Sequence, residues 1–315
     1  MSESIRERIH NLDDIAVKLY RNEDVAEALG LLFSELQERR DHLSPESWKQ
    51  FITTNCRQHS LLELLHQDPF SSRAFLKPRG YAGDAEMLDM IYAIEDGETL
   101  PALQRSSELG RKIYHATANV AAARAVRSRR WIITERLNKL TTRMAGPHVL
   151  SLACGHLREA RHCSALLQGR FGRFVAADQD RESLAVVERE VGDFGVEAVA
   201  TSVRTLLKDQ VALGSFDFIY ASGLYDYLSQ AVAQKLTERL FAMLTPGGRL
   251  LLANFLPSSS STAFMEAYMD WWLIYRTKAE MLQLVNTLPE EEMGQCHLFT
   301  EEHENIVFLE VERRR

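Results

Sequence analysis

The sequence predicts an α/β protein, in which a parallel sheet with helices on both faces follows an all-helical N-terminal domain. Residues 1–145 show apolar side chains at helical spacing, few glycines and no clear strand. From residue 147 onward, short apolar runs alternate with helical patterns, as they do where helices connect the strands of a parallel sheet. We therefore expect two domains, a helical one at 1–145 and a sheet domain at 146–315.

The helical part contains several separate helix signals. Apolar residues recur at helical spacing within 15–19, 25–36 and 61–65. Ser44 before Pro45 predicts a helix start, with Ser44 as the cap and Pro45 at the first helical position. An irregular segment at 77–84 precedes a helix predicted at 85–94. A longer helix, with room for one break, is predicted at 106–144.

Five short apolar runs predict the strands of the parallel sheet. They lie at 149–153, 174–177, 196–200, 216–221 and 249–255. The second run ends at Asp178, and a Thr-Pro-Gly-Gly turn precedes the fifth. Near the end of the chain, 297–299 and 305–311 predict an antiparallel pair at an edge of the sheet.

Composition and charge restrict the classes of function. The 315 residues carry a net charge of −7, which argues against a dedicated nucleic-acid binder. The basic cluster of Arg124, Arg127, Arg129 and Arg130 is expected to be a solvated helix face. The four cysteines match no zinc pattern, so no metal is expected. The charged N-terminus and the lack of a long apolar run favour a cytoplasmic protein with reduced thiols and no stable membrane insertion.

Two turns that follow predicted strands form a candidate ligand site. Gly155 follows the first strand, where a glycine lets a ligand approach the backbone and the next helix offers its positive N-terminus. Asp178 ends the second strand, 23 positions after Gly155, and is placed to accept hydrogen bonds from ribose hydroxyls. The alternative is that Asp178 or Asp180 only caps the following helix.

The fourth strand ends in the segment Ser-Gly-Leu-Tyr-Asp-Tyr-Leu at 222–228. This segment also lies at the carboxyl edge of the sheet, where ligands bind in folds of this kind. Its tyrosines and aspartate suit a binding loop, and the alternative is an aromatic cluster that holds the next helix. In the helical part, Gly80 and Gly83 flank Tyr81. That loop can present Tyr81 and Asp84 to a site or enter a helix with Asp84 as its cap, and both can be true.

These residues resemble class I S-adenosylmethionine-dependent methyltransferases, which have a Rossmann-like sheet. The resemblance rests on the run 149–159, on Asp178, on the Ser-Gly step at 222–223 and on the Pro-Gly-Gly turn at 246–248. It covers about half of the chain, from residue 147 onward. Ser151 stands where an acidic residue is frequent in the family, and Leu157 stands where a further glycine is frequent. A dinucleotide is not indicated, because the GxGxxG pattern is absent.

A narrower resemblance covers nearly the whole chain. It rests on the segments 79–84, 153–155, 223–228 and 270–276. These segments are similar to those of bacterial methyltransferases that make the methyl ester of a 3-hydroxy fatty acid, 3-hydroxypalmitic acid, as a quorum-sensing signal. The aromatic residues of 270–276 suit an apolar acceptor such as an acyl chain, and the alternative is a packed core helix.

The resemblance implies S-adenosylmethionine as cofactor and assigns roles to individual residues. The 153–156 loop would face the methionine part, Glu159 would support that loop or reach the amino group, Asp178 would hold the ribose, and 202–204 would flank the adenine. The cofactor-binding set is Ala153, Cys154, Gly155, His156, Glu159, Asp178, Gln179, Ser202, Val203, Arg204, Ser222, Gly223 and Leu224. The catalytic candidates are Tyr225, Asp226 and Tyr81. The acceptor-binding candidates are Arg79, Asp84, Tyr114, Asn119, Arg127, Trp272, Tyr275 and Arg276.

The chemistry required depends on the acceptor. A carboxylate is already ionised near neutral pH and needs only a positive or hydrogen-bonding group to orient it, for which the candidates are Arg79, Arg127, Tyr81, Tyr225 and Arg276. A hydroxyl or amine needs a base, and Asp226, Asp84 or His115 become the candidates. The helical domain would cover the site and exclude water.

Three other functions stay open on the sequence. The chain could methylate the oxygen or nitrogen of another natural product, or bind the cofactor as a regulator without turnover. The departures at Ser151 and Leu157 leave the second option open. A methyltransferase of protein or RNA is the third, and the acidic net charge disfavours RNA. A small-molecule acceptor is the expected partner, and a homodimer is left open.

Overall fold

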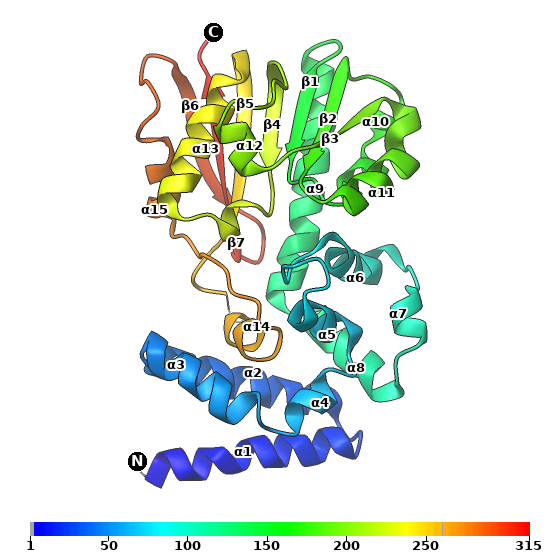
Figure 1. Ribbon diagram of the computed structural model, residues 1–315, viewed down its shortest axis with the longest axis vertical. Helices are drawn as coiled ribbons and strands as arrows, with labels where there is room; N and C mark the ends of the chain where they lie inside the picture. The colour runs from blue at the N-terminus through cyan, green and yellow to red at the C-terminus, as the bar shows by residue number, and fades with distance from the viewer. Residues whose placement is uncertain (1–2, 260) are drawn as a thin grey trace. The chain divides into compact units, whose positions relative to one another are not determined.

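The computed structural model describes residues 3–259 and 261–315, with side chains from residue 12 onward (Figure 1). The chain divides into two compact units. The helical unit comprises Met1–Arg124 and Ser259–Trp272. The sheet unit comprises Ala125–Ser258 and Leu273–Arg315. Each unit is built from segments that are separated in the sequence.

The helical unit contains no strand among its described residues, as its periodicity predicts. Ser44 caps α3, with its side chain accepting from the Ser47 N–H, and Pro45 takes the first helical position as expected. The predicted long helix breaks once, between α8 and α9. The helices of this unit are α1 (Glu3–Tyr20), α2 (Val25–His42), α3 (Pro45–Phe51), a π-helix (Ile52–Cys56), α4 (Leu61–Leu65), α5 (Pro69–Leu76), α6 (Ala85–Asp96), α7 (Pro101–Gln104), α8 (Glu108–Thr117), the first turn of α9 (Ala121–Arg143) and α14 (Thr262–Tyr268).

Helix α14 follows the last parallel strand in sequence but belongs to the helical unit. Its Glu266 is 3% exposed and accepts a hydrogen bond from Trp48 Nε1 at 2.7 Å. The same carboxylate pairs with Arg40 at 2.8 Å. Just beyond α14, Asp270 pairs with Arg57 and Lys77. A buried carboxylate that keeps two partners is expensive to release, so these bonds fix 259–272 to the helices around it.

The division differs from the boundary expected after residue 145 because most of α9 packs with the sheet unit. Thr134 donates to the backbone oxygen of Glu159, although at the long distance of 3.4 Å. Asn138 accepts from the backbone N–H of Ala165 at 2.9 Å. Arg136 pairs with Glu310 at 2.9 Å. The division after Arg124 falls within α9, about six turns before the boundary expected from the end of the helical pattern, at 3.6 residues per turn.

The sheet unit holds seven strands in the order β3-β2-β1-β4-β5-β7-β6 (Figure 1). Strands β3, β2, β1, β4 and β5 run parallel, and β7 pairs antiparallel with both β5 and β6. The strands are β1 (His148–Leu152), β2 (Arg173–Asp178), β3 (Val196–Ala200), β4 (Phe216–Ala221), β5 (Leu244–Phe255), β6 (Met293–Thr300) and β7 (Ile306–Arg313). The remaining α-helices of this unit are α10 (Ser164–Leu167), α11 (Arg181–Val191), α12 (Val203–Leu207), α13 (Gln230–Ala242) and α15 (Lys278–Leu282).

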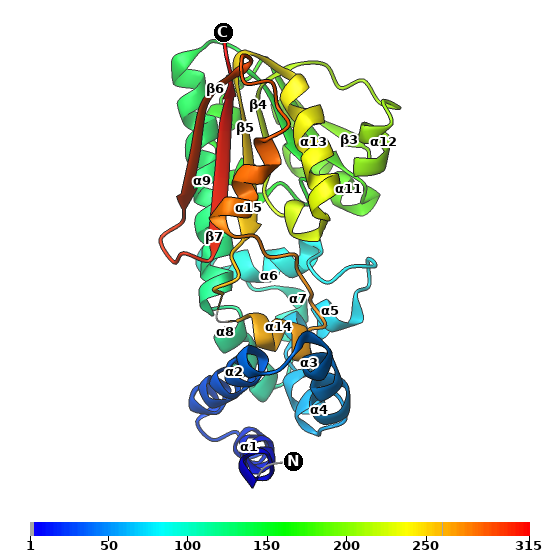
Figure 2. The same ribbon diagram turned by 90° about the vertical axis from the view of Figure 1, so that its left-hand side faces the viewer.

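Helices cover both faces of this sheet, with α9 on one side and α13 on the other (Figure 2). Leu150 of β1, Ile219 of β4 and Leu250 of β5 belong to one buried cluster with Leu236 and Leu240 of α13. These strand residues are fully buried, which is why the strands appear in the sequence as unbroken apolar runs. The predicted Rossmann-like α/β class is confirmed.

The last two strands differ from the prediction in one respect. They form the expected antiparallel pair, but β7 lies inside the sheet between β5 and β6, and β6 alone is the edge. Every residue from Ile306 to Val311 is buried, whereas the residues of β6 are exposed or half-buried. The interior position of β7 in the sheet accounts for the apolar run at its start, Ile306 to Leu309.

Candidate functional site

The strand order places a topological switch point between β1 and β4, because β1 is followed by β2 on one side and β4 by β5 on the other. In open α/β sheets the carboxyl ends of the strands at such a point form the ligand crevice. The segments that follow β1, β2 and β4 all leave the sheet at this edge. They are the segments that the sequence singled out.

The loop after β1 has a strained backbone. Ala153, Gly155 and Leu157 all adopt left-handed conformations, with φ of 54°, 53° and 50°. Glycine takes this conformation freely, whereas a side chain costs about 1–2 kcal/mol there. The loop is fastened to the neighbouring strand by a 3.2 Å hydrogen bond from the Cys154 N–H to the Ala177 oxygen. Leu157 therefore occupies a conformation that suits the glycine frequent at this position.

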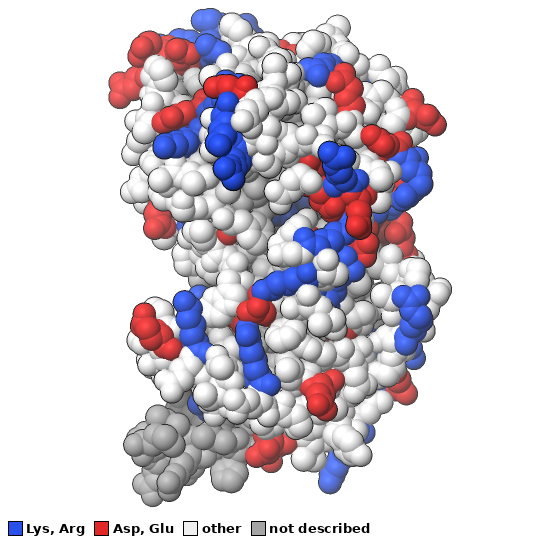
Figure 3. All heavy atoms as spheres, viewed as in Figure 1, with Lys and Arg blue, Asp and Glu red and all other residues white. Residues whose placement is uncertain are grey.

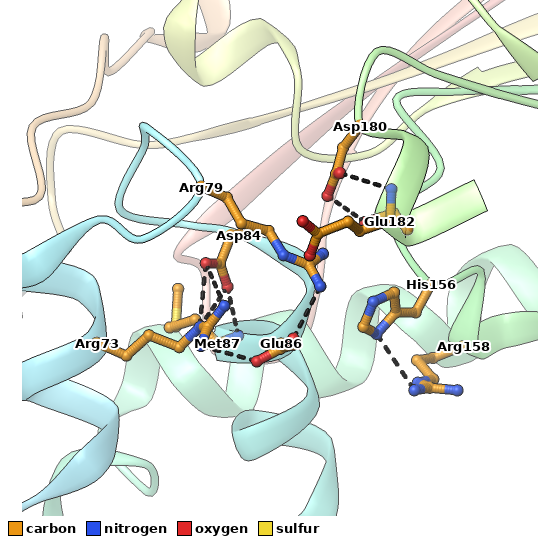
Figure 4. Close-up of polar contacts among 10 residues, drawn as sticks. Arg73, Arg79, Asp84, Glu86, Met87, His156, Arg158, Asp180 and Glu182 are labelled. Carbon is orange, nitrogen blue, oxygen red and sulfur yellow. Dashed lines mark hydrogen bonds and ion pairs between the residues drawn. The ribbon is translucent and has the colours of Figure 1, made fainter. Parts of the chain in front are cut away.

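Asp178 links the ends of β1 and β2. One carboxylate oxygen accepts from the Gly155 N–H at 2.9 Å, and the other accepts from the Asp180 N–H at 2.9 Å. A carboxylate has about four acceptor sites, so two remain for ligand hydroxyls. Asp180 caps α11, accepting from the Glu182 N–H at 3.0 Å (Figure 4). The capping alternative thus applies to Asp180, and Asp178 keeps the acceptor capacity that a ribose diol needs.

Glu159 is a buried carboxylate next to the β1 loop. It accepts from the Tyr220 hydroxyl of β4 at 2.6 Å. Ser151 of β1 hydrogen-bonds the same tyrosine side chain. Burial raises the pKa of Glu159, and the Tyr220 hydrogen bond opposes that rise. Ser151 stands where the family often has an acidic residue. Here the Glu159 carboxylate is linked to this position of β1 by hydrogen bonds through the Tyr220 hydroxyl.

Asp226 lies in the segment after β4 and is 3% exposed. One of its oxygens accepts from the Phe255 N–H of β5 at 2.7 Å. Burial raises the pKa of Asp226 to about 7, against the opposing effect of that hydrogen bond and of Arg129 and Arg276. A carboxyl that titrates near neutrality can serve as a general base at physiological pH.

Tyr225 has a different environment from the one expected for a catalytic side chain. It is fully buried and belongs to the hydrophobic cluster behind the sheet. Its hydroxyl pairs with Thr237 of α13 at 3.0 Å. This geometry corresponds to the aromatic-anchor alternative for the 222–228 segment. The hydroxyl points into the core because α13 supplies its polar partner.

Arg276 is 1% exposed and forms the centre of a hydrogen-bond network. It donates to the backbone oxygens of Tyr225 at 2.7 Å and Leu228 at 2.5 Å. It also donates to Asn254 Oδ1 at 2.6 Å and Gln230 Oε1 at 2.9 Å. The guanidinium therefore holds the 225–228 turn against β5, and its donors are engaged by the protein rather than directed to an acceptor.

The remaining site candidates of the sheet unit lie near the same edge or just beyond it. Ser202 caps α12, accepting from the Thr205 N–H at 3.1 Å. The Thr201 N–H donates to the backbone carbonyl oxygen of Asp178 at 2.8 Å. Val203 and Arg204 begin α12, Gln179 is exposed after β2, and His156 hydrogen-bonds Arg158 at 3.2 Å (Figure 4). Ser222, Gly223 and Leu224 follow β4 directly. Arg127 of α9 is 8% exposed, and Tyr275 is half-buried.

The candidates in the helical unit are held by their own neighbours. Asp84 is fully buried, caps α6 through the Met87 N–H at 2.8 Å and pairs with Arg73 (Figure 4). Arg79 pairs with Glu86 at 2.8 Å. Tyr114 donates to the Met90 oxygen at 2.6 Å, Asn119 donates to the His115 oxygen at 2.9 Å, and Tyr81 lies half-buried in the loop before α6. The alternative that Asp84 caps the following helix is confirmed. A role of the 79–84 loop in a binding site stays a prediction.

The aromatic segment 270–276 is not helical. Residues 270–277 have no regular secondary structure, and the Trp272 indole donates to Asp270 at 2.9 Å. Trp272 is 37% exposed. The core-helix alternative for this segment is therefore wrong, because ion pairs at Asp270 and hydrogen bonds at Arg276 hold it in a non-helical path.

The basic cluster on α9 is not a solvated face. Arg129 is 4% exposed and Arg130 is 1% exposed. Only Arg124 is fully exposed among the four arginines named in the cluster. Sequence reasoning missed Arg129 because a run of charges indicates a surface, and nothing in the local pattern marks which arginines face the sheet.

The surface carries both signs of charge. On the face shown in Figure 3, Lys and Arg side chains lie among Asp and Glu side chains. Ion pairs between partly exposed side chains, such as Arg173 with Glu197 at 2.8 Å, occur in the sheet unit. Among the described residues, no group of three metal-ligating side chains is found. No helix within the described part of the chain is long and apolar enough to cross a membrane.

Residues 149–248 match the family model for a methyltransferase domain. This part of the chain is a methyltransferase domain. Its cofactor is S-adenosylmethionine, and the protein is a methyltransferase that depends on it. The matched residues run from the start of β1 into β5, and thus contain every segment of the switch-point edge described above.

Among solved structures, a possible exported protein from Bordetella parapertussis is similar to this chain with a TM-score of 0.64. The two are 17% identical, and the likeness covers 88% of this chain and 99% of that one, so it shows a shared fold alone. No curated protein matches the chain.

Two solved methyltransferases are more distant. The N-methyltransferase NodS from Bradyrhizobium japonicum WM9, in complex with S-adenosyl-l-homocysteine, has a TM-score of 0.44 at 14% identity and covers 60% of this chain and 88% of that one. Magnesium protoporphyrin IX methyltransferase (ChlM) from Synechocystis PCC 6803 with bound S-adenosylmethionine has a TM-score of 0.43 at 13% identity and covers 62% and 84%. Likenesses this weak add nothing to the fold assignment.

Proposed function

We propose that this methyltransferase acts on a small apolar acceptor and converts the carboxylate of a 3-hydroxy fatty acid to its methyl ester. The arrangement that supports cofactor binding is the Asp178 carboxylate, which fastens Gly155 and keeps two acceptor sites. The acceptor class is supported by the resemblance carried by 79–84, 223–228 and 270–276. We further expect the protein to work in the cytoplasm.

The cofactor would lie along the switch-point edge. Asp178 would accept from the ribose hydroxyls, while the 153–156 loop and Glu159 would face the methionine part. Gln179 and residues 202–204 would flank the adenine, with Ser222, Gly223 and Leu224 near the reactive methyl. The bound sulfonium supplies an electrophilic methyl group, so the protein mainly provides alignment and electrostatic complementarity.

The acceptor oxygen forms a bond to the methyl carbon while the carbon–sulfur bond breaks. The electron pair of the broken bond stays on sulfur. A carboxylate acceptor needs no base, because it is ionised near neutral pH. It needs a cation in the cleft, for which Arg127 of the sheet unit is a candidate. A hydroxyl or amine acceptor would need a base, and Asp226, whose pKa is raised to about 7, is the candidate.

Calorimetric titration with S-adenosylmethionine and S-adenosylhomocysteine tests the cofactor site. Asp178→Ala should abolish binding, while Asp193→Ala, an exposed carboxylate of the same unit, should leave it unchanged. If the folded wild-type protein binds neither ligand, with or without an acceptor present, the proposal is wrong.

An acceptor screen then tests the reaction. The proposal expects S-adenosylhomocysteine to be released with 3-hydroxy fatty acids and expects a methyl ester by mass spectrometry. Turnover on natural products with a hydroxyl or amine instead would show that the proposed acceptor is wrong and that the protein is still an active methyltransferase. Tight cofactor binding with no methylated product from any acceptor would favour a regulator without turnover. Sedimentation of the same sample decides whether the protein is a homodimer.

A further inference from the structure

A buried cation at the switch-point edge has no hydrogen-bond or ion-pair partner among the described residues. Arg129 lies on the part of α9 that belongs to the sheet unit and is 4% exposed. Its guanidinium lies against the backbone after β4, since a Cβ built on Gly223 would be 3.7 and 3.8 Å from its two terminal nitrogens. Among the residues that the structure describes, no oxygen accepts a hydrogen bond or forms an ion pair with Arg129.

Such an arrangement is costly for folding alone. A guanidinium has five N–H donors, and a buried charge is normally retained only where those donors are satisfied. Arg276 shows the satisfied case in the same unit, with four of its five donors taken up by Tyr225, Leu228, Asn254 and Gln230. Arg129 lacks these bonds, and its nitrogens are not among the fully enclosed unpaired atoms, so they keep contact with solvent and are accessible to a ligand.

The two carboxylates that face Arg129 are already engaged. Glu159, after β1, accepts from Tyr220, and Asp226, after β4, accepts from the Phe255 N–H. Both interact with Arg129 through their charge but not through hydrogen bonds. Burial raises the pKa of each carboxyl, which weakens the local negative charge available to balance the guanidinium.

We propose that Arg129 binds a carboxylate of one of the two reactants, with its planar fork of N–H donors turned to the ligand at the switch point between β1 and β4. A guanidinium recognises a carboxylate through two parallel hydrogen bonds, and Glu159 and Gly223 place this one where the β1 and β4 segments meet. The inference rests on the proposed function and deepens it. The carboxylate belongs either to the methionine end of the cofactor or to the acceptor.

Two cofactor analogues that differ only in the amino acid end distinguish a cofactor carboxylate from an acceptor carboxylate. S-adenosylhomocysteine carries the amino acid end, and methylthioadenosine lacks it. If Arg129 holds the cofactor carboxylate, Arg129→Gln should weaken S-adenosylhomocysteine by about 10- to 100-fold and leave methylthioadenosine unchanged. Arg129→Lys should recover part of the loss, since a lysine keeps the charge but not the fork. Arg143→Gln, an exposed arginine in the last turn of the same helix, is the matched control.

If Arg129 holds the acceptor carboxylate, both cofactor ligands should bind Arg129→Gln as they bind the wild type. In that case KM for a fatty acid should rise about 10- to 100-fold, and KM for an acceptor without a carboxylate should not. The inference is overturned if Arg129→Gln matches Arg143→Gln in both ligand affinities and in KM. Intact methylthioadenosine binding by the variants shows that they are folded. Failure of the wild type to bind S-adenosylhomocysteine would instead count against the proposed function.

Discussion

The turns after β1 and β4 leave the sheet at the same edge but are stabilised in opposite ways. After β1, the backbone is strained at Ala153 and Leu157, and one carboxylate, Asp178, fastens the loop while retaining acceptor capacity. After β4, the turn is held by Arg276, which makes four hydrogen bonds to acceptors of the protein. The first turn leaves part of its polar capacity unused by the protein, whereas the polar groups of the second turn are bonded within the fold. Substitutions in the two turns should therefore separate binding from stability.

Arg276→Met should have the largest effect on stability. It removes a buried cation and leaves two backbone oxygens, Asn254 and the Asp226 carboxyl without their donor or counter-charge. Loss of one side of a buried network costs about 3–5 kcal/mol. Urea unfolding measures this, with the exposed Arg143→Met as control. A loss below about 1 kcal/mol, typical of exposed pairs, would show that the network is not structural.

Asp178→Asn should show the reverse balance. The variant keeps the shape of the side chain but loses the charge that accepts from the Gly155 N–H. Affinity for S-adenosylhomocysteine should fall about 10- to 100-fold, while the free energy of unfolding should fall by about 1 kcal/mol. Titration calorimetry and urea unfolding on one preparation give both values. Equal losses in binding and stability would remove the contrast between the two turns.

Asp226 should make the stability of the protein depend on pH. Its folded pKa is raised to about 7, whereas the unfolded value is about 3.9, so the folded state binds the proton more tightly between these values. The stability from this group is therefore fully present below about pH 4 and is lost as the pH rises through about 7. Asp226→Asn should remove this component, so that the variant gains on the wild type with rising pH in urea unfolding. A constant difference from pH 4 to 8 would contradict the assignment.

The same variant sharpens the chemistry. If the acceptor is a carboxylate, Asp226→Asn should retain turnover within about tenfold, because general base catalysis is not used. A loss of about 100-fold or more, together with a wild-type rate that rises with pH through about 7, would make Asp226 a base and the acceptor a hydroxyl or amine.

Ala153→Gly should have the smallest effect, with opposite sign. Its φ of 54° favours glycine, so the substitution should raise the free energy of unfolding by up to about 1 kcal/mol. Ala200→Gly, at the end of β3, should lower it by about 0.5–1 kcal/mol. Thermal unfolding of the pair measures the difference. A destabilised Ala153→Gly variant would mean that the Ala153 side chain contributes packing that outweighs the strain.

The sequence by itself determined the alternation of strands and helices and the position of the ligand edge. Parallel strands buried on both faces are mostly apolar, so β1, β2 and β4 stand out locally within a residue of their ends. Gly155 and Asp178 follow directly from those ends. The Ser44 and Asp84 caps are local as well, because a cap contacts only the first turn of its own helix.

Only the tertiary structure decided which charged side chains are buried and what they contact. Arg129 and Arg143 lie on one helix and look alike in sequence, yet one is enclosed beside Gly223 and the other is exposed. The same holds for Tyr225, whose hydroxyl finds Thr237, and for 259–272, which packs with the helical unit. These outcomes depend on residues far away in sequence, and a local pattern carries no information about such partners.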